Sequence, residues 1–232
     1  MTMARLKAFV ERTTATRAGN LGKVLLFCEG PTEVCYFEHF SKIIRAHRNK
    51  YSHIDIVPVP AGGNAQAVLN FAEAFLSDEE NLRMYSLYEK HLVFDCDAPP
   101  NIQAVIHNML ASAHGYDLLL TNLLFETWLL MHVEEVDHTC SHSKKKIMER
   151  LSHALGREYG KKQDDMPGIV RQLIGDGDNL RKAISYADSL DQTYTAQHLH
   201  IQTNILQMNP YTSVHRLMEL ILSEMQKIDG NP

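Results

Sequence analysis

Val24-Leu25-Leu26-Phe27-Cys28-Glu29-Gly30-Pro31-Thr32-Glu33 is a continuous apolar run that ends in a carboxylate, a turn and a second carboxylate. A run that is apolar at every position is typical of a strand buried on both faces, as in a parallel sheet covered by helices. Later in the chain, Leu92-Val93-Phe94-Asp95-Cys96-Asp97 repeats the pattern. Such sheets carry their chemistry just past the carboxyl ends of their strands. Both stretches therefore predict acids at one edge of a sheet.

Strand and helix patterns alternate through the first half of the chain, which predicts an α/β fold with a mostly parallel sheet flanked by helices. A helix should follow each of the first three strands, and a charged connector should run from residue 77 to the third strand. The expected strands cover residues 23–29, 53–59, 91–97 and 117–121.

The second half of the chain is expected to form a helical C-terminal extension. The predicted organisation is a basic arm (1–21), an α/β catalytic domain (22–133) and a helical region packed on the same core (134–232). The last helix carries one apolar stripe, which indicates either core packing or an interface. The expected helices of this half cover residues 123–132, 144–155, 167–174, 178–190 and 211–228.

The composition is that of an ordinary globular protein. Of its 232 residues 44% are hydrophobic and 22% charged, and the net charge is −5. This net charge argues against binding nucleic acid through bulk electrostatics alone. Basic residues nevertheless outnumber acidic ones in residues 1–23 and again in 144–162, which suits the approach of a phosphate backbone.

The sequence predicts a soluble, cytoplasmic protein. Cys28, Cys35, Cys96 and Cys140 form no C-x-x-C pair and are expected to be reduced thiols, mostly buried. No apolar run approaches the roughly 18 residues of a membrane span, and no apolar signal core opens the chain. The 13 histidines are scattered without zinc-site spacing, so surface or capping positions are expected for them.

The carboxylates after the two apolar runs are the leading candidates for a metal site. Asp95 and Asp97 stand at i and i+2 of a strand and therefore project to the same face. Glu29 ends a buried strand, where an acid without a partner is costly. Grouped carboxylates repel one another unless a cation lies between them, and oxygen ligands suit Mg²⁺ or Mn²⁺. Asp97 and Glu33 have a second interpretation, as favourable charges at helix starts.

Two further motifs leave alternatives open. Glu126 lies inside a strongly apolar stretch, where it is a metal ligand, the partner of a basic side chain, or an exposed position on an amphipathic helix. The turn Gly62-Gly63-Asn64 precedes a helix and can offer backbone N–H groups to a phosphate. A simple strand-to-helix turn also explains its glycines.

The lysine run Lys144-Lys145-Lys146 is the third candidate, for binding nucleic acid. Lysines that follow one another along a helix can neutralise successive phosphates. The other interpretation of this run is a solvated surface.

Three stretches of the chain, taken in order, carry a resemblance to a known family. They are Cys28-Glu29-Gly30-Pro31-Thr32-Glu33-Val34-Cys35-Tyr36-Phe37, Phe125-Glu126-Thr127-Trp128-Leu129-Leu130 and Asn209-Pro210-Tyr211-Thr212-Ser213-Val214-His215. These stretches resemble the RloB-like branch of the Toprim proteins. Toprim is the catalytic domain of topoisomerases, primases and OLD-type nucleases, and the RloB-like branch is linked to restriction and abortive-infection loci. The chain departs from this pattern at Leu123, where the family usually has a proline.

The resemblance implies a Toprim-like sheet in residues 22–133 and a role for each acid. Glu29 would be the acid/base or metal-organising glutamate, and Asp95 with Asp97 the metal ligands. Glu33 and Glu126 would be auxiliary acids. The helical half would add a tyrosine and lysine element, supplied by Tyr159, Lys161 and Lys162.

The function expected from the resemblance is Mg²⁺- or Mn²⁺-dependent cleavage of nucleic acid by a toxic effector of anti-phage defence. RNA, including tRNA, is favoured slightly over DNA as the substrate. A partner ATPase or self-association would restrain the activity. The alternatives are a primase-like nucleotidyl transferase, which uses the same acids, and a non-catalytic module that binds nucleic acid or an ATPase.

Overall fold

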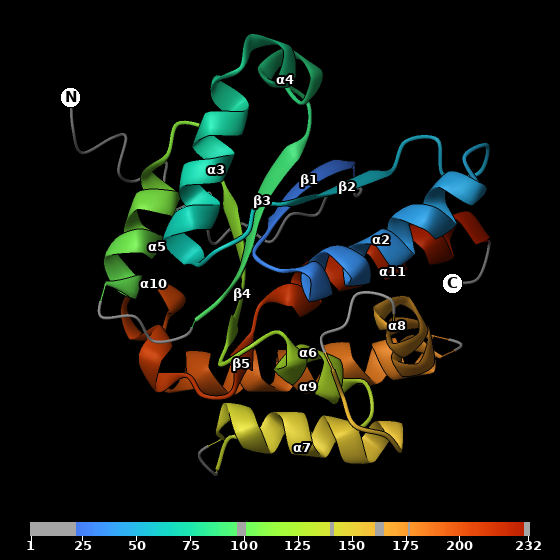
Figure 1. Ribbon diagram of the computed structural model, residues 1–232, viewed down its shortest axis with the longest axis vertical. Coiled ribbons are helices and arrows are strands. Elements are labelled where there is room, and N and C mark those ends of the chain that lie inside the picture. Colours follow the sequence, from blue (N-terminus) through green and yellow to red (C-terminus); the bar gives the residue numbers. More distant parts are fainter. Residues whose placement is uncertain (1–21, 97–100, 140–141, 161–164, 176, 230–232) are drawn as a thin grey trace.

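A computed structural model shows an α/β protein built on one mixed five-stranded sheet (Figure 1). It describes residues 22–96, 101–139, 142–160, 165–175 and 177–229. The strand order is β2-β1-β3-β4-β5, the first four strands are parallel, and β5 is antiparallel to β4. The expected mostly parallel sheet is thus confirmed. The strands are β1 (Lys23–Cys28), β2 (Asp55–Pro60), β3 (Glu89–Asp95), β4 (Asp117–Asn122) and β5 (Tyr211–Thr212).

Helices cover both faces of the sheet. Helices α3 and α5 lie on one face, and α2 and α11 on the other, while α6 to α9 form a helical layer below the sheet in Figure 1. The helices are α2 (Pro31–Ala46), α3 (Ala65–Ser77), α4 (Glu79–Met84), α5 (Ile102–Ala111), α6 (Glu126–Met131), α7 (Lys144–Leu155), α8 (Met166–Ile174), α9 (Asp178–Ala196), α10 (Ile201–Asn204) and α11 (Val214–Asp229), with a 3₁₀ turn η1 (Ile205–Gln207).

Strand β1 is the centre of the core. It pairs with β2 on one side and β3 on the other, and residues 24–28 have no solvent exposure. The ring of Phe27 meets Phe71 and Phe75 of α3 edge to face, which anchors that helix on the sheet. A strand covered on both faces gains from apolar residues at every position. This explains the unbroken apolar run in the sequence.

Two expected segments differ from the structure. The charged connector from residue 77 contains α4, which begins where the Asp78 side chain accepts hydrogen bonds from the N–H groups of Glu80 and Asn81. The predicted helix 211–228 begins instead with β5, whose Tyr211 pairs with Asn122 of β4. Sheet pairing therefore overrides the helical pattern in the first two residues of that segment.

The C-terminal region is joined to the sheet by buried polar contacts as well as by β5. The Ser213 hydroxyl accepts from the Leu120 N–H at 3.0 Å, and the Asn122 amide donates to two backbone oxygens of residues 205–208 at 2.8 Å each. Four members of the apolar stripe on α11 are at most 2% exposed, so the stripe packs inside the chain and not on a partner. These members are Val214, Leu217, Met218 and Ile221.

The cysteine and membrane expectations can be examined in the described residues. Cys28 and Cys96 are buried and Cys35 is partly buried, while Cys140 lies outside those residues. None of the helices formed by the described residues is long and apolar enough to span a lipid bilayer.

The surface positions expected for the histidines are wrong for His91, His132, His142 and His215, which are all buried. His132 and His215 are at most 2% exposed. The Nδ1 atom of His132 lies 3.0 Å from the Trp128 carbonyl, which can only accept, so Nδ1 carries the proton. Its Nε2 then accepts from the Tyr36 hydroxyl at 3.1 Å. Burial lowers the pKa of both histidines to about 4.

We expect stability to fall as the pH is lowered from 7 to 5. The unfolded chain protonates histidine near pH 6.5, whereas folded His132 stays neutral down to about pH 4, so protons favour the unfolded state between these values. His132→Gln should make the loss smaller by about 2 kcal/mol. Urea unfolding of both proteins at pH 7 and pH 5 measures this. An equal loss in the two proteins would assign the acid sensitivity to other groups.

Candidate functional site at the carboxyl ends of β1 and β3

Glu29 and Asp95 meet where the strand order of the sheet reverses. Helix α2 after β1 lies on one face of the sheet and α5 after β3 lies on the other, which makes the ends of these neighbouring strands a topological switch point. Ligands of open α/β sheets bind at such switch points. The Glu29 N–H donates to the Val93 carbonyl at 2.9 Å, which fixes the start of the turn.

The Glu29 carboxylate is held by the neighbouring strand. Its Oε2 accepts a hydrogen bond from the Asp95 N–H at 3.0 Å. Both residues are partly exposed, although Oδ1 of Asp95 is buried. The structure thus brings together the two acids that the apolar runs predicted. Asp97, the third acid of that prediction, lies outside the described residues.

Glu33 lies next to this pair, in the first turn of α2, and is only 5% exposed. A Cβ atom added to Gly30 would stand 2.8 Å from Glu33 Oε2. A side chain at position 30 would therefore have to displace the Glu33 carboxylate. The sequence analysis did not predict Gly30 as part of the site, although Gly30 lies between Glu29 and Glu33 in the sequence.

Glu126 is fully buried at the start of α6 and bonded to a tyrosine from the helical region. The Tyr159 hydroxyl donates to Glu126 Oε1 at 2.9 Å. Burial raises the pKa of Tyr159 well above its usual range, and the charges of Glu126 and Glu33 raise it further. The tyrosine thus stays a neutral donor near both acids. Because Glu126 is fully buried, the prediction that it could occupy an exposed position on an amphipathic helix is wrong.

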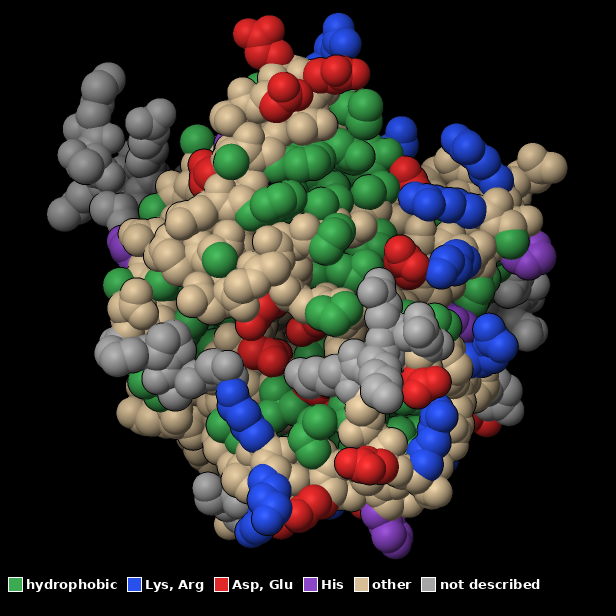
Figure 2. All heavy atoms as spheres, viewed as in Figure 1, with side chains coloured by type: hydrophobic (Ala, Val, Ile, Leu, Met, Phe, Trp, Pro, Cys, Tyr) green, Lys and Arg blue, Asp and Glu red, His purple; other side chains and the backbone are tan. Residues whose placement is uncertain are grey.

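Figure 2 shows the distribution of charged side chains on one face of the molecule. Acidic side chains gather in a hollow at the centre of the face, at the level where the strands end, and Lys and Arg side chains lie at its lower border. Lys161 and Lys162, the predicted catalytic lysines, lie outside the described residues. Tyr159 is the described member of the expected tyrosine and lysine element.

The turn Gly62-Gly63-Asn64 borders the same edge. The preceding Ala61 donates its N–H to the Cys28 carbonyl at 2.8 Å, which places the turn beside the end of β1. The Asn64 side chain accepts from the Ala67 N–H at 3.1 Å and so caps α3. Asn64 therefore caps a helix, and the turn lies beside the acids. Its predicted binding of phosphate stays a prediction.

The lysine run is separated from the acids by a helix. Lys144, Lys145 and Lys146 are exposed on the first turn of α7, which packs on α6 on the side away from the sheet (Figure 1). Lys145 lies 3.7 Å from Glu149. Cations at a helix N-terminus oppose the helix dipole. The position of the run is therefore unfavourable with respect to the dipole of α7.

Among the described residues, three side chains whose ligand atoms lie close enough together to share a metal ion are found at the opposite edge of the sheet. Glu89 and His91 stand at i and i+2 of β3, and Asp117 is the register partner of His91 on β4. One ligand atom from each lies within 4.8 Å of the others. No motif in the sequence pointed to this group, because it depends on the pairing of β3 with β4.

The profile of the RloB-like protein family matches residues 24–221, from β1 into α11. The chain belongs to the RloB-like protein family. The resemblance noted in three separate stretches is thereby confirmed. No curated protein and no solved structure matches the chain.

The acids of this RloB-like protein suit a hard divalent cation. Glu29 and Asp95 offer carboxylate oxygens at the partly exposed edge of the sheet, and Glu33 stands one helical turn from Glu29. Oxygen donors of this kind favour Mg²⁺ or Mn²⁺ over zinc. Glu126 is fully buried and shares its Oε1 with Tyr159, so it fits a supporting role better than direct ligation.

The two glycines beside the site should differ in their tolerance of alanine. Gly62 has a φ of +74° with open space around it, whereas Gly63 has a φ of +88° and its added Cβ would lie 2.6 Å from the Ala67 Cβ. Gly62→Ala should cost about 1–2 kcal/mol for the left-handed backbone. Gly63→Ala should cost about 1–3 kcal/mol more because of the clash. Denaturant unfolding measures both, and equal losses would contradict the packing argument.

Proposed function

We propose that this RloB-like protein is a metal-dependent nuclease that cleaves phosphodiester bonds of nucleic acid. The observation that carries the proposal is the meeting of Glu29 and Asp95 at the switch point of the sheet, joined by the 3.0 Å hydrogen bond. Carboxylates gathered at this edge suit a cation that binds phosphate oxygens. The resemblance to Toprim nucleases supports the same chemistry.

Glu29 and Asp95, together with Asp97, would hold Mg²⁺ or Mn²⁺. Glu33 would be a further acid beside them. The bound cation would neutralise charge on the phosphate and lower the pKa of a water molecule. Glu29 is kept in place by the Asp95 N–H, so its carboxylate is oriented before substrate arrives. Glu126, held by Tyr159, would support the site from the side of the helical region.

The substrate, setting and control of the proposed nuclease follow from the resemblance. RNA, including tRNA, is the favoured substrate over DNA, and the protein would act in the cytoplasm as a toxic effector of anti-phage defence. A partner ATPase or a self-assembled form would restrain it. Comparing cleavage of total tRNA, single-stranded RNA and linear and supercoiled DNA would test the substrate order.

Removal of the acids should abolish cleavage without unfolding the protein. Glu29→Gln keeps an oxygen that can accept from the Asp95 N–H, and Asp95→Asn keeps the backbone donor. Each should lower the cleavage rate by about two orders of magnitude or more. EDTA should abolish wild-type cleavage, and Mg²⁺ or Mn²⁺ should restore it. Thermal stability should stay the same or rise, because repelling acids are removed.

His91→Ala is the matched control, since it alters the other possible metal group and leaves the switch point intact. Mn²⁺ binding followed by calorimetry should be weakened by Glu29→Gln and unchanged by His91→Ala. Full cleavage after rigorous chelation, or unfolding of both acid variants, would overturn the proposal.

The lysines of α7 should affect binding more than chemistry. Replacing Lys144, Lys145 and Lys146 with Gln should make substrate binding less sensitive to salt. The slope of log binding constant against log salt concentration should become shallower by up to about 0.7 for each phosphate of a single strand that these lysines neutralise. The rate at saturating substrate should change little. Lys182→Gln, an exposed position on α9, is the control. An unaltered salt slope would assign the run to solvated surface.

A further inference from the structure

A basic cavity lies at the edge of the sheet opposite Glu29 and Asp95. It has a volume of about 360 Å³ and is formed where β1 and β2 begin, where the chain enters β3, and where α2 ends. Strands of six residues separate the two edges by about 20 Å. Its lining residues are Lys23, Ile44, Arg45, Arg48, Ser52, Ile54, Asp55 and Tyr88.

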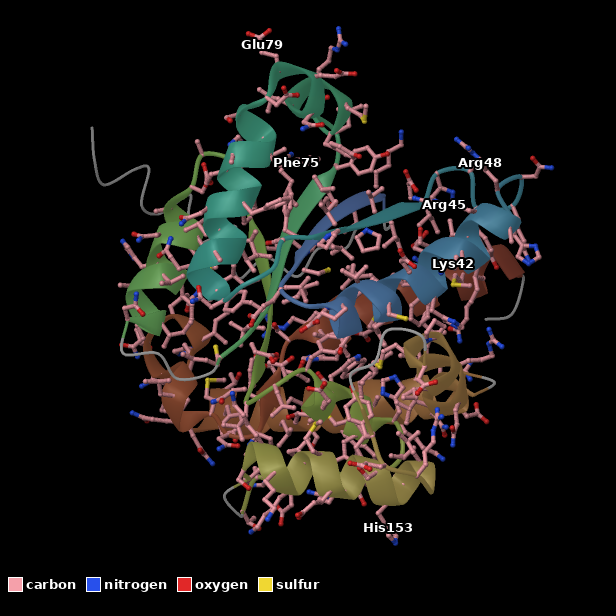
Figure 3. The ribbon with its side chains drawn as sticks, viewed as in Figure 1. Lys42, Arg45, Arg48, Phe75, Glu79 and His153 are labelled. Carbon is pink, nitrogen blue, oxygen red and sulfur yellow. The ribbon has the colours of Figure 1, made fainter. Side chains whose placement is uncertain are left out.

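Positive charge is concentrated in this cavity. Three cations, Lys23, Arg45 and Arg48, line it with one carboxylate, Asp55. Arg45 lies 3.9 Å from Asp55, at the outer limit of an ion pair. Within the described part of the chain Arg48 forms no ion pair. Figure 2 shows Lys and Arg side chains gathered over this end of α2, and Figure 3 labels Arg45 and Arg48 there.

The end of α2 does not explain the cations by itself. Arg45 and Arg48 lie near the carbonyl end of the helix, where positive charge is favourable. Lys23, however, comes from β1, and its ammonium group lies 5.5 Å from the centre of the Tyr88 ring. Three cations from two elements thus line one concave site, which raises the local affinity for anions.

The remaining walls are built for a compact ligand. The Tyr88 hydroxyl donates to Asp55 Oδ2 at 2.8 Å, which fixes both side chains. Burial, and then Asp55, raise the pKa of Tyr88 to about 12, so it keeps its proton at neutral pH. Ile44 and Ile54 add apolar surface, and the Ser52 hydroxyl adds a polar group.

We propose that this basic cavity binds a mononucleotide through its phosphates. Arg45, Arg48 and Lys23 would bind the phosphate oxygens, because guanidinium and ammonium groups make charge-assisted hydrogen bonds to phosphate. The Tyr88 ring and the apolar wall would contact the base, and Asp55 can accept from a ribose hydroxyl. The volume lies within the range of small-molecule pockets, which begins near 300 Å³.

The surroundings favour a mononucleotide over a nucleic-acid strand. A strand needs a track of cations, but Lys42, one turn before Arg45 on α2, is bound by Glu38 at 2.9 Å. The basic surface therefore does not continue along the helix towards the acidic site. The proposal does not depend on the nuclease assignment, because the cavity shares no residue with the switch point.

Binding of ATP measured by calorimetry in EDTA tests the inference while keeping metal out of the acidic site. ATP should bind more tightly than AMP, and inorganic pyrophosphate more weakly than ATP because it lacks the nucleoside. Changing Arg45 and Arg48 together to Ala should weaken ATP binding by about tenfold or more, since both charge-assisted contacts to the phosphates are lost. Both residues are exposed, so folding should be kept.

Lys42→Ala is the matched control, because it removes an exposed cation from the same helix outside the cavity. It should leave ATP affinity unchanged, as should Glu29→Gln. The proposal is overturned if ATP does not bind at millimolar concentration, or if the double variant binds it as well as wild type. Tighter binding of a five-nucleotide RNA than of ATP, abolished in the double variant, would assign the cavity to a nucleic-acid backbone instead.

Discussion

The rest of the structure depends on the burial of β1 between two parallel strands and two helical layers. Residues 24–28 are inaccessible to solvent, so the strand leaves the core only at its ends. Because its helix turns to one face and the helix after β3 turns to the other, the carboxyl end of β1 is a topological switch point of the sheet. A polar group placed there is supported by the core and still reaches solvent. Glu29 occupies that position.

Grouping acids at one edge of the sheet opposes folding, because the carboxylates repel one another and lose water. Local exposure and hydrogen bonds reduce both unfavourable contributions. Glu29 stays partly exposed and accepts the N–H of Asp95. Glu126, which is fully buried, accepts a hydrogen bond from the Tyr159 hydroxyl. A hydrogen bond from a neutral donor stabilises a carboxylate without adding a charge to the group. The helical region therefore supplies part of the acidic site, although it follows the sheet in the chain.

Helix α2 connects the two edges of the sheet and carries charges that match its dipole. Glu33 lies in its first turn, beside the acids, and Arg45 lies in its last turn, beside the basic cavity. Negative charge is favourable at a helix N-terminus and positive charge at its C-terminus. One helix thus contributes to an acidic site at one end and to a basic cavity at the other. The core between them keeps the two sites about 20 Å apart.

The sequence by itself determined the α/β class and the places of Glu29 and Asp95, because burial on both faces requires unbroken apolar runs and parallel strands end at one edge. Only the tertiary structure decided that Tyr159 meets Glu126, that Tyr211 begins a fifth strand, and that a basic cavity forms at the far edge. These contacts join residues that are distant in the chain. The spacing of apolar residues along a helix or strand indicates which side of it is buried. Which other element packs against that side depends on the tertiary structure.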